Sequence, residues 1–171
     1  MIQQNIAFLL TGSNLGHRLT NLQQAHSFIE PTLGNVLAAS SFYQTAAWGL
    51  LNQGAFLNQV LKVQTTLSAH DLLEAVLAIE LQMGRERRQH WGERLIDIDI
   101  LFFNEDIVST PKLTLPHPYL HQRKFTLVPM AEISPYWQHP IYRRTIEELA
   151  EECTDSLEVE LYQSASIGSP S

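Results

Sequence analysis

Two aspartates stand inside an apolar run, and their type and spacing make them the first candidates for chemistry. The run GERLIDIDILFF covers residues 92–103, with Asp97 and Asp99 set between isoleucines. In a strand, alternate side chains share a face, so both carboxylates point one way and the isoleucines point the other. Two like charges on one face repel, and burying either unpaired is costly. That face must therefore meet cations or water. Carboxylate oxygens held on a rigid strand suit Mg²⁺.

A basic loop precedes this run and strengthens the metal interpretation. Residues 84–94 read GRERRQHWGER, in a protein whose net charge is −7. Guanidinium groups beside paired carboxylates suit a polyphosphate carried with Mg²⁺, because arginine binds phosphate oxygens in a bidentate way. The alternative is a solvated basic loop balanced by its own two glutamates. Its glycine ends and high charge predict a lid that becomes ordered when ligands bind.

Other polar stretches carry weaker signals. The stretch LTLPHPYLHQRKF (113–125) adds His117, His121, Arg123 and Lys124. The two histidines have a zinc-like spacing, but Pro118 disfavours a regular helix there, so contacts with phosphate or ribose are the better interpretation. The stretch TGSNLGHR lacks the spacing of a phosphate-binding loop and predicts a turn between a strand and a helix. Trp48 and Trp91, in polar loops flanked by glycine, suggest a flat ring stacked between them.

The elements that must position these residues follow from hydrophobic periodicity. Strands are predicted at Asn5–Leu10, Asn35–Thr45, Phe56–Thr66, Leu95–Phe103 and Leu157–Tyr162. Helices are predicted at His17–Glu30, from Ser68 to Gly84, at Phe125–Ile133 and at Thr145–Glu152, with Pro31 ending the first and capping boxes opening the second and fourth. Since Phe102 and Phe103 break simple alternation, the aspartate strand is expected to be central and largely covered. The βαββαβ order predicts an α+β fold with a ferredoxin-like core, followed by extra C-terminal helices and a strand.

Composition bounds the class of protein. The 171 residues are 44% hydrophobic and 17% charged, which suits one globular domain, expected over residues 1–163 with a disordered tail at 164–171. An acidic net charge of −7 argues against a nucleic-acid or anionic-membrane binder. The single cysteine, Cys153, and the lack of a recognisable signal peptide or membrane span predict a cytoplasmic protein, expected to be a monomer.

Taken in order, several blocks make the sequence similar to a known family, the 6-hydroxymethyl-7,8-dihydropterin pyrophosphokinases of folate biosynthesis. The blocks are GSNLG, SSFYQTAAWG, FLNQV, IELQMGRERR, WGER, DIDILFF and LTLPHPYLHQRKF, within residues 12–130. The resemblance implies a ferredoxin-like α+β fold, which agrees with the element order. It also implies transfer of pyrophosphate from ATP to the pterin's hydroxymethyl oxygen, with release of AMP.

The same resemblance implies roles for individual residues. Asp97 and Asp99 would hold two Mg²⁺ ions, and Arg85 and Arg94 would be the catalytic arginines. The positions that would contact the pterin are Thr45, Ala46, Trp48, Phe56, Asn58, Trp91 and Phe125. The positions that would contact the nucleotide are Glu80, Arg87, Ile100, Lys112, Thr114, His117 and Arg123.

The chain departs from the family pattern at a few of these positions. Ala46 and Ala47 replace prolines, Phe56 replaces a tyrosine, and Leu77 replaces a glutamine. Lys112 replaces an arginine and loses its bidentate fork. The arginine loop is one residue short, which leaves the register of Arg87 and Arg88 open. None of these changes touches the aspartate pair.

Two other classes of protein fit the same topology. A polymerase-palm-like nucleotidyl transferase also carries strand carboxylates, but it needs a basic template groove, and the sequence pI is about 5.4. A non-enzymatic regulatory domain that binds a small molecule would need neither the arginines nor the aspartates. Metal-dependent nucleotide binding distinguishes the three classes.

Overall fold

A computed structural model describes residues 3–45, 55–84 and 95–163. The strands are β1 (Asn5–Ser13), β2 (Asn35–Ala39), β3 (Tyr43–Thr45), β4 (Phe56–Thr65), β5 (Asp97–Phe103), β6 (Val108–Ser109), β7 (Thr114–Leu115) and β8 (Val159–Leu161). The helices are α1 (Arg18–Thr32), α2 (Ala69–Gln82), α3 (Lys124–Ile133) and α4 (Ile146–Glu152), with a short 3-10 turn, η1, at Leu120–Gln122. None of the helices in these described ranges is long and apolar enough to cross a membrane.

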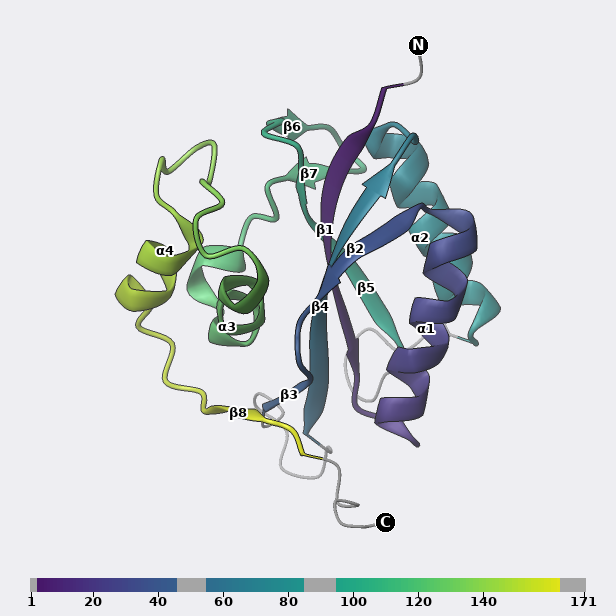
Figure 1. The fold of residues 1–171 in the computed structure, drawn as a ribbon, viewed down its shortest axis with the longest axis horizontal. Helices are drawn as coiled ribbons and strands as arrows, with labels where there is room; N and C mark the ends of the chain where they lie inside the picture. Colours follow the sequence, from purple (N-terminus) through teal and green to yellow (C-terminus); the bar gives the residue numbers. More distant parts are fainter. Residues whose placement is uncertain (1–2, 46–54, 85–94, 164–171) are drawn as a thin grey trace.

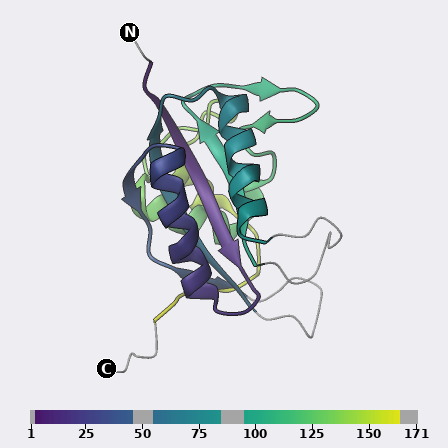
Figure 2. The ribbon, with the colours of Figure 1, turned by 90° about the vertical axis from the view of Figure 1, so that its right-hand side faces the viewer.

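The main sheet is antiparallel and confirms the predicted ferredoxin-like core. Its strand order is β5-β1-β4-β3-β8, and β2 pairs with β4 beside β3. The two βαβ crossovers therefore interleave, because β4 lies between β1 and the β2–β3 segment. Helices α1 and α2 cover one face of the sheet, and α3 and α4 lie against the other (Figures 1 and 2). The molecule thus has three layers, with the sheet in the middle.

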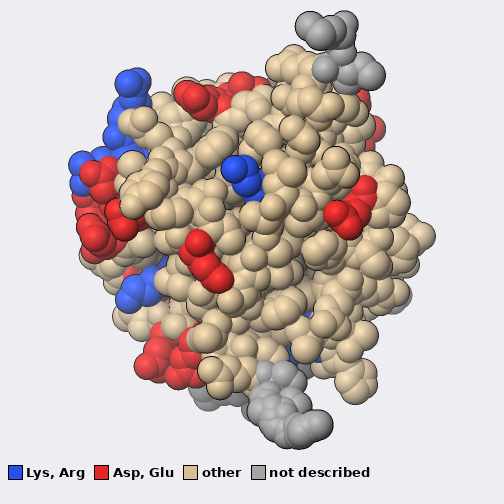
Figure 3. Space-filling model, in the orientation of Figure 1, with Lys and Arg blue, Asp and Glu red and all other residues tan. Residues whose placement is uncertain are grey.

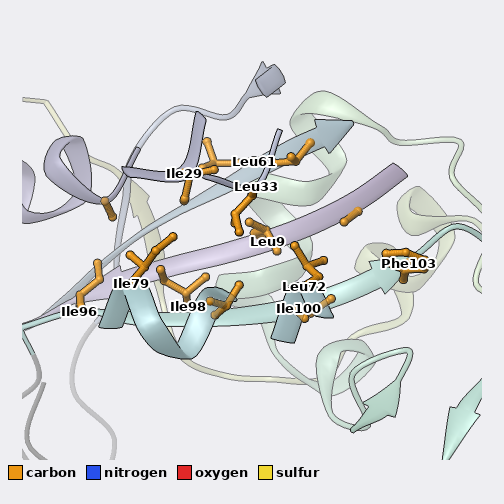
Figure 4. Close-up of a cluster of buried hydrophobic side chains, with 14 of the residues drawn as sticks. Leu9, Ile29, Leu33, Leu61, Leu72, Ile79, Ile96, Ile98, Ile100 and Phe103 are labelled. Atoms are coloured by element: carbon orange, nitrogen blue, oxygen red, sulfur yellow. The ribbon is translucent and has the colours of Figure 1, made fainter. Parts of the chain in front are cut away.

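The face under α1 and α2 is closed by an aliphatic core. Leu9, Leu61 and Ile98 come from three neighbouring strands, and Ile29 and Ile79 come from the two helices (Figure 4). All of these side chains are at most 4% exposed. Periodicity explains the arrangement, because alternate strand residues and one stripe of each helix meet in the same layer.

The opposite face is closed only in part, by a core of aliphatic and aromatic side chains beneath α3 and α4. Trp137 lies 4.8 Å from Phe8 and 6.2 Å from Phe102, between ring centroids and in tilted, edge-on geometries. Leu127 and Met130 of α3 complete this cluster, both at 0% exposure. The rest of that face, towards the Asp97 end of β5, carries the site described below.

The prediction that the aspartate strand is central is wrong, because β5 lies at one edge of the sheet. Its pairing with β1 shifts so that Phe8 faces Phe102 while Leu9 faces Ile100, which leaves Leu101 as an extra bulged residue. This bulge explains why Phe102 and Phe103 break alternation. The edge is nevertheless covered. Glu80 Oε2 accepts a hydrogen bond from the Ile98 N–H at 2.7 Å, and the His117 N–H donates to the Leu101 carbonyl at 3.0 Å.

The predicted strand Asn35–Thr45 is two strands in the structure. Between β2 and β3 the Ser40 N–H still donates to the Val60 carbonyl at 2.9 Å, but the Val60 N–H donates to the Ser40 hydroxyl, also at 2.9 Å, so a side chain takes part in the bonding where the two strands are separated. Helix α1 runs one residue past Pro31, because the Leu33 N–H still reaches the Ile29 carbonyl at 2.7 Å. The β6–β7 hairpin and η1 were not predicted.

The predicted caps of α2 and α4 are confirmed. Ser68 accepts from the Asp71 N–H, and Thr145 and Glu148 form a reciprocal capping box.

Charged side chains of both signs gather over α4, and the centre of the face in Figure 3 is mostly uncharged.

Candidate active site

A cavity of about 610 Å³ lies on the α3 side of the sheet, within the usual size range of small-molecule sites. It brings together predicted residues of all three kinds: the metal pair, the pterin set and the nucleotide set. Its lining residues are Leu10, Gly12, Thr45, Phe56, Asn58, Asp97, Asp99, Tyr119, Gln122, Arg123, Phe125, Asp155 and Leu157.

Strand register sets the floor of the cavity. Gly12 of β1 lies opposite Asp97 on one side and Asn58 on the other, so the three residues form a row across β5, β1 and β4. A Cβ at Gly12 would lie 2.4 Å from Asn58 Nδ2. Only glycine therefore leaves room for the Asn58 amide in this position. The sequence-based expectation that Gly12 forms a turn is wrong, because β1 continues to Ser13.

Two residues that line this cavity each carry a buried polar atom without a hydrogen-bond partner among the residues that the structure describes. The two atoms are Asn58 Oδ1 and Thr45 Oγ1, in side chains at 5% and 3% exposure. Asn58 Nδ2 donates a hydrogen bond to the Thr11 carbonyl at 3.2 Å, and this bond fixes the orientation of the amide group and therefore of Oδ1. A buried acceptor without a partner costs free energy, so both atoms are suited to hydrogen bonds with a polar ligand.

Aromatic and cationic side chains from the start of β4 and from the η1–α3 region also line or flank the cavity. Phe56 begins β4, and Phe125 lies in the first turn of α3. The Arg123 guanidinium lies 5.3 Å from the Tyr119 ring centroid and 5.6 Å from that of Phe125. These distances fit cation–π contacts that hold the cation at the cavity wall.

The half-buried Asp97 and Asp99 line the same cavity from β5. The Ile98 between them faces the aliphatic core, which confirms the predicted alternation of faces. Among the described residues, no group of three or more His, Cys, Asp or Glu side chains could hold a metal ion. Two carboxylates fit Mg²⁺, which keeps several waters and substrate phosphate oxygens as its other ligands.

His117 lies beside this site as a neutral hydrogen-bonding group. Burial and the nearby positive charge of Arg123 lower its pKa from 6.5 to about 4. Its Nδ1 accepts from the Tyr119 N–H at 3.2 Å, which places the ring proton on Nε2. His117 can thus donate a hydrogen bond at neutral pH but adds no charge.

The strand that leads to Thr45 is fastened to α3. Glu132 accepts hydrogen bonds from the Tyr43 hydroxyl at 2.7 Å, the Ser41 hydroxyl at 2.8 Å and the Ser41 N–H at 3.0 Å. Burial and the bond to Glu132 raise the pKa of Tyr43 to about 12. Burial alone would raise the pKa of Glu132, but the bonds from Tyr43 and Ser41 outweigh it and lower that pKa.

The remaining predicted residues lie elsewhere. The exposed Lys112 and Thr114 are on the β6–β7 hairpin, away from the cavity lining. The Ile100 side chain packs into the aliphatic core on the opposite face, so Ile100 can face a cavity ligand only through its main chain. Glu80 bonds to the main chain of β5. Predicted positions outside the described residues are Ala46, Trp48, Arg85, Arg87, Arg88, Trp91 and Arg94, and with them the predicted lid.

Cavity residues that the sequence analysis missed are Leu10, Gly12, Tyr119, Gln122, Asp155 and Leu157. Leu10 and Gly12 could have been found from the sequence. They are two residues apart in one strand, so both lie on the same face of the sheet, and Gly12 pairs with Asn58. Asp155 and Leu157 gave no local signal, because tertiary packing alone brings the C-terminal segment to the cavity.

Comparison with known proteins identifies the family of this chain. Residues 8–135 match the family model described as 7,8-dihydro-6-hydroxymethylpterin-pyrophosphokinase (HPPK). The chain belongs to this family.

Similar curated proteins are also pyrophosphokinases of a hydroxymethyl pterin. The 2-amino-4-hydroxy-6-hydroxymethyldihydropteridine pyrophosphokinase of Aquifex aeolicus is 41% identical over 86% of this chain and 91% of its own. That of Bacillus subtilis is also 41% identical, over 75% of this chain and 78% of its own. Membership in this family of pyrophosphokinases sets aside the nucleotidyl-transferase and regulatory-domain alternatives.

Solved structures share the fold. Plasmodium falciparum HPPK-DHPS with pteroate matches with a TM-score of 0.73 at 17% identity, over 88% of this chain and 42% of that one. A triple mutant of the same protein matches with a TM-score of 0.74 at 17% identity, over 97% of this chain and 44% of that one. This chain therefore spans less than half of those longer chains, and the likeness concerns the fold alone.

Proposed function

We propose that the cavity on the α3 side of the sheet is the active site, with the pterin at the β3–β4 end and the ATP phosphates at the β5 end. The family's reaction is transfer of pyrophosphate from ATP to 6-hydroxymethyl-7,8-dihydropterin in folate biosynthesis. One observation carries the placement. Thr45 and Asn58, which each carry a buried polar atom without a partner among the described residues, line the same cavity as Asp97 and Asp99.

At the β5 end, Asp97 and Asp99 would hold two Mg²⁺ ions together with the phosphates. The family uses ATP and depends in general on Mg²⁺. The carboxylates share one face of a strand whose backbone is fixed by Glu80, which keeps their spacing constant. When bound, the metal ions neutralise the phosphate charge that would otherwise repel the aspartates and the attacking oxygen.

At the other end, Phe56 and Phe125 would hold the flat faces of the pterin ring. Thr45 Oγ1 and Asn58 Oδ1 would bond to its polar edge, which gives both buried atoms the partner they lack among the described residues. By resemblance, Ala46, Trp48 and Trp91 complete this end.

The nucleotide would lie beside η1 and the start of α3. Arg123 offers a guanidinium already held at the wall, and His117 offers its Nε2 proton. Residues that would complete the nucleotide contacts by resemblance are Glu80, Arg87, Ile100, Lys112 and Thr114, with Arg85 and Arg94 as the catalytic arginines.

In the reaction, the hydroxymethyl oxygen bonds to the β-phosphorus of ATP. The bond from that phosphorus to the oxygen bridging to the α-phosphorus breaks, AMP leaves, and the hydroxyl proton is released. The residues of this chain align the reactants: Phe56 and Phe125 orient the pterin and its hydroxymethyl oxygen, and Arg123 restrains the phosphates. No side chain is assigned as general base.

The experiment is to supply ATP labelled at its α-phosphorus together with Mg²⁺ and the pterin. The proposal expects labelled AMP in equal amount to the pyrophosphorylated pterin, and no label in ADP. Labelled ADP, or nucleotide joined to the pterin, would contradict it.

We also infer that residues 1–163 form one domain, and that the enzyme acts as a cytoplasmic monomer without nucleic acid. A net charge of −7 supports the lack of nucleic-acid binding, and pairing of β8 with β3 supports a single domain. Light scattering after gel filtration tests the monomer, which predicts a mass near 19.4 kDa.

A further inference from the structure

The segment after α4 returns to the cavity, although it lies outside the residues 8–135 that match the family model. Exposure alternates along it: residues 153, 155, 157 and 159 are half-buried, and residues 154, 156, 158 and 160 are exposed. This is the pattern of an extended chain with one face inward. Two of the inward side chains, Asp155 and Leu157, line the cavity.

The first anchor of this segment is a cap on α3. Asp155 Oδ2 accepts a hydrogen bond from the Lys124 N–H at 3.0 Å, and Oδ1 accepts from the Leu157 N–H at 3.0 Å. Lys124 is the first residue of α3, and its neighbour Arg123 provides no side-chain cap. Asp155 therefore acts as a cap from elsewhere in the chain, where a carboxylate also interacts favourably with the helix dipole. Arg123 and Phe125 flank the capped N–H.

The second anchor is the pairing of β8 with β3. Val159 lies opposite Thr45, and the Tyr162 N–H donates to the Phe42 carbonyl at 2.8 Å. Only residues 156–158 connect the two anchors. Leu157 must therefore span the gap between the start of α3, which carries Phe125, and the end of β3, which carries Thr45.

We infer that this C-terminal segment forms one wall of the pterin site and takes part in binding the pterin. Leu157 is a specificity-determining residue that contacts the pterin ring, and Asp155 is a positioning residue that holds Arg123 and Phe125 in place. The inference rests on the proposed assignment of this end of the cavity to the pterin. It adds an apolar contact to the aromatic faces and the two polar atoms already described.

The first test compares two leucines of the same segment. Leu157→Ala removes an inward side chain, and Leu161→Ala removes one that is 52% exposed and does not line the cavity. Loss of a leucine contact should raise the KM for the pterin about five- to tenfold in Leu157→Ala, with kcat and the KM for ATP within about twofold. Leu161→Ala should match the wild type. A Leu157→Ala enzyme with an unchanged pterin KM would overturn the inference.

The second test separates positioning from mere stability at Asp155. Asp155→Ala should raise the KM values for both substrates several-fold at a temperature where circular dichroism shows the fold intact. Asp155→Asn keeps one acceptor oxygen and should recover part of the loss. Glu158→Gln, at an exposed neighbouring position, is the charge control. A lowered melting temperature with both KM values unchanged would show a cap without a role in the site.

The failures of the two proposals are distinguishable. If the wild-type enzyme forms no AMP from ATP and the pterin, the proposed function fails. If the wild type turns over and the Leu157 and Asp155 variants match it, only the role of the C-terminal segment fails.

Discussion

The two faces of the sheet have different roles, although the same strands form both: one face is packed into a core, and the other lines the cavity. Beneath α1 and α2 the side chains are mostly aliphatic, fully buried and closely packed. Beneath α3 the closed part mixes aliphatic side chains with the aromatic rings of Phe8, Phe102 and Trp137, and the cavity adds polar and charged side chains. Strand β5 serves both, since Ile98 enters the aliphatic core while Asp97 and Asp99 face the cavity. The alternation of a strand lets stability and chemistry be separated by one residue, and substitutions on the two faces should therefore have different consequences.

The largest effect is expected at the carboxylates. Asp99→Asn removes a ligand charge without changing shape, and activity should fall about a thousandfold or more, because metal-assisted charge stabilisation is worth several kcal/mol. The free energy of unfolding should change little by comparison, because the substitution keeps the size and shape of a half-buried side chain. Steady-state kinetics and urea unfolding measure the two effects. Asp106→Asn, at an exposed position after β5, is the control. Near-normal turnover by Asp99→Asn would show that Asp99 does not hold a metal ion needed for the reaction.

The mirror-image result is expected on the aliphatic face. Leu61 is 0% exposed. Leu61→Ala should lower the free energy of unfolding by about 2–5 kcal/mol through lost burial and a residual cavity. Both KM values should stay near those of the wild type below the unfolding transition. A large change in either KM with little loss of stability would show that the two faces are not separable in this way.

A smaller effect should follow at the cavity floor. Gly12→Ala would push the Asn58 amide aside, since the new Cβ would lie 2.4 Å from Nδ2. The pterin KM should rise about tenfold, close to the value of one well-placed hydrogen bond, with less change in the KM for ATP. Gly16→Ala is a comparison at a glycine with no heavy atom within 4 Å, although its φ of +69° adds backbone strain. An unchanged pterin KM in Gly12→Ala would mean that Asn58 does not contact the pterin.

The mildest effect concerns pH, in the closed half of the α3 side. His139 is 2% exposed, and its Nδ1 accepts from the Ile141 and Tyr142 N–H groups at 3.1 and 3.2 Å. Burial, and then the charge of His121, lower its pKa from 6.5 to about 4. Between these values the unfolded chain binds more protons, so stability should be complete above pH 6.5 and fall on acidification towards pH 4.

The expected slope for this one group is at most about 1.4 kcal/mol per pH unit. Urea unfolding at several pH values measures it. His139→Gln should flatten the curve in this window, with His17→Gln as the control variant. An equal slope in His139→Gln and the wild type would rule out His139 as its source.

Local signals predicted much of the fold and part of the site. Alternation placed Asp97 and Asp99 on one face, and the caps at Ser68 and Thr145 followed from short polar patterns. The bulge at Leu101 could not be predicted, because it depends on pairing with β1. Asp155 likewise serves a helix 31 residues earlier in the chain, a partnership that no local pattern encodes.

The central claim is that one face of the sheet holds the metal-bound phosphates and the pterin at opposite ends of a single cavity. A crystal structure with Mg²⁺, α,β-methylene ATP and 6-hydroxymethyl-7,8-dihydropterin tests it most directly, because this analogue cannot break at the reacting bridge. We expect Mg²⁺ at about 2.0–2.1 Å from oxygens of Asp97 and Asp99. We also expect pterin atoms within about 3.2 Å of Asn58 Oδ1 and Thr45 Oγ1. A metal ion held by other side chains, or a pterin bound away from Asn58 and Phe125, would contradict the account.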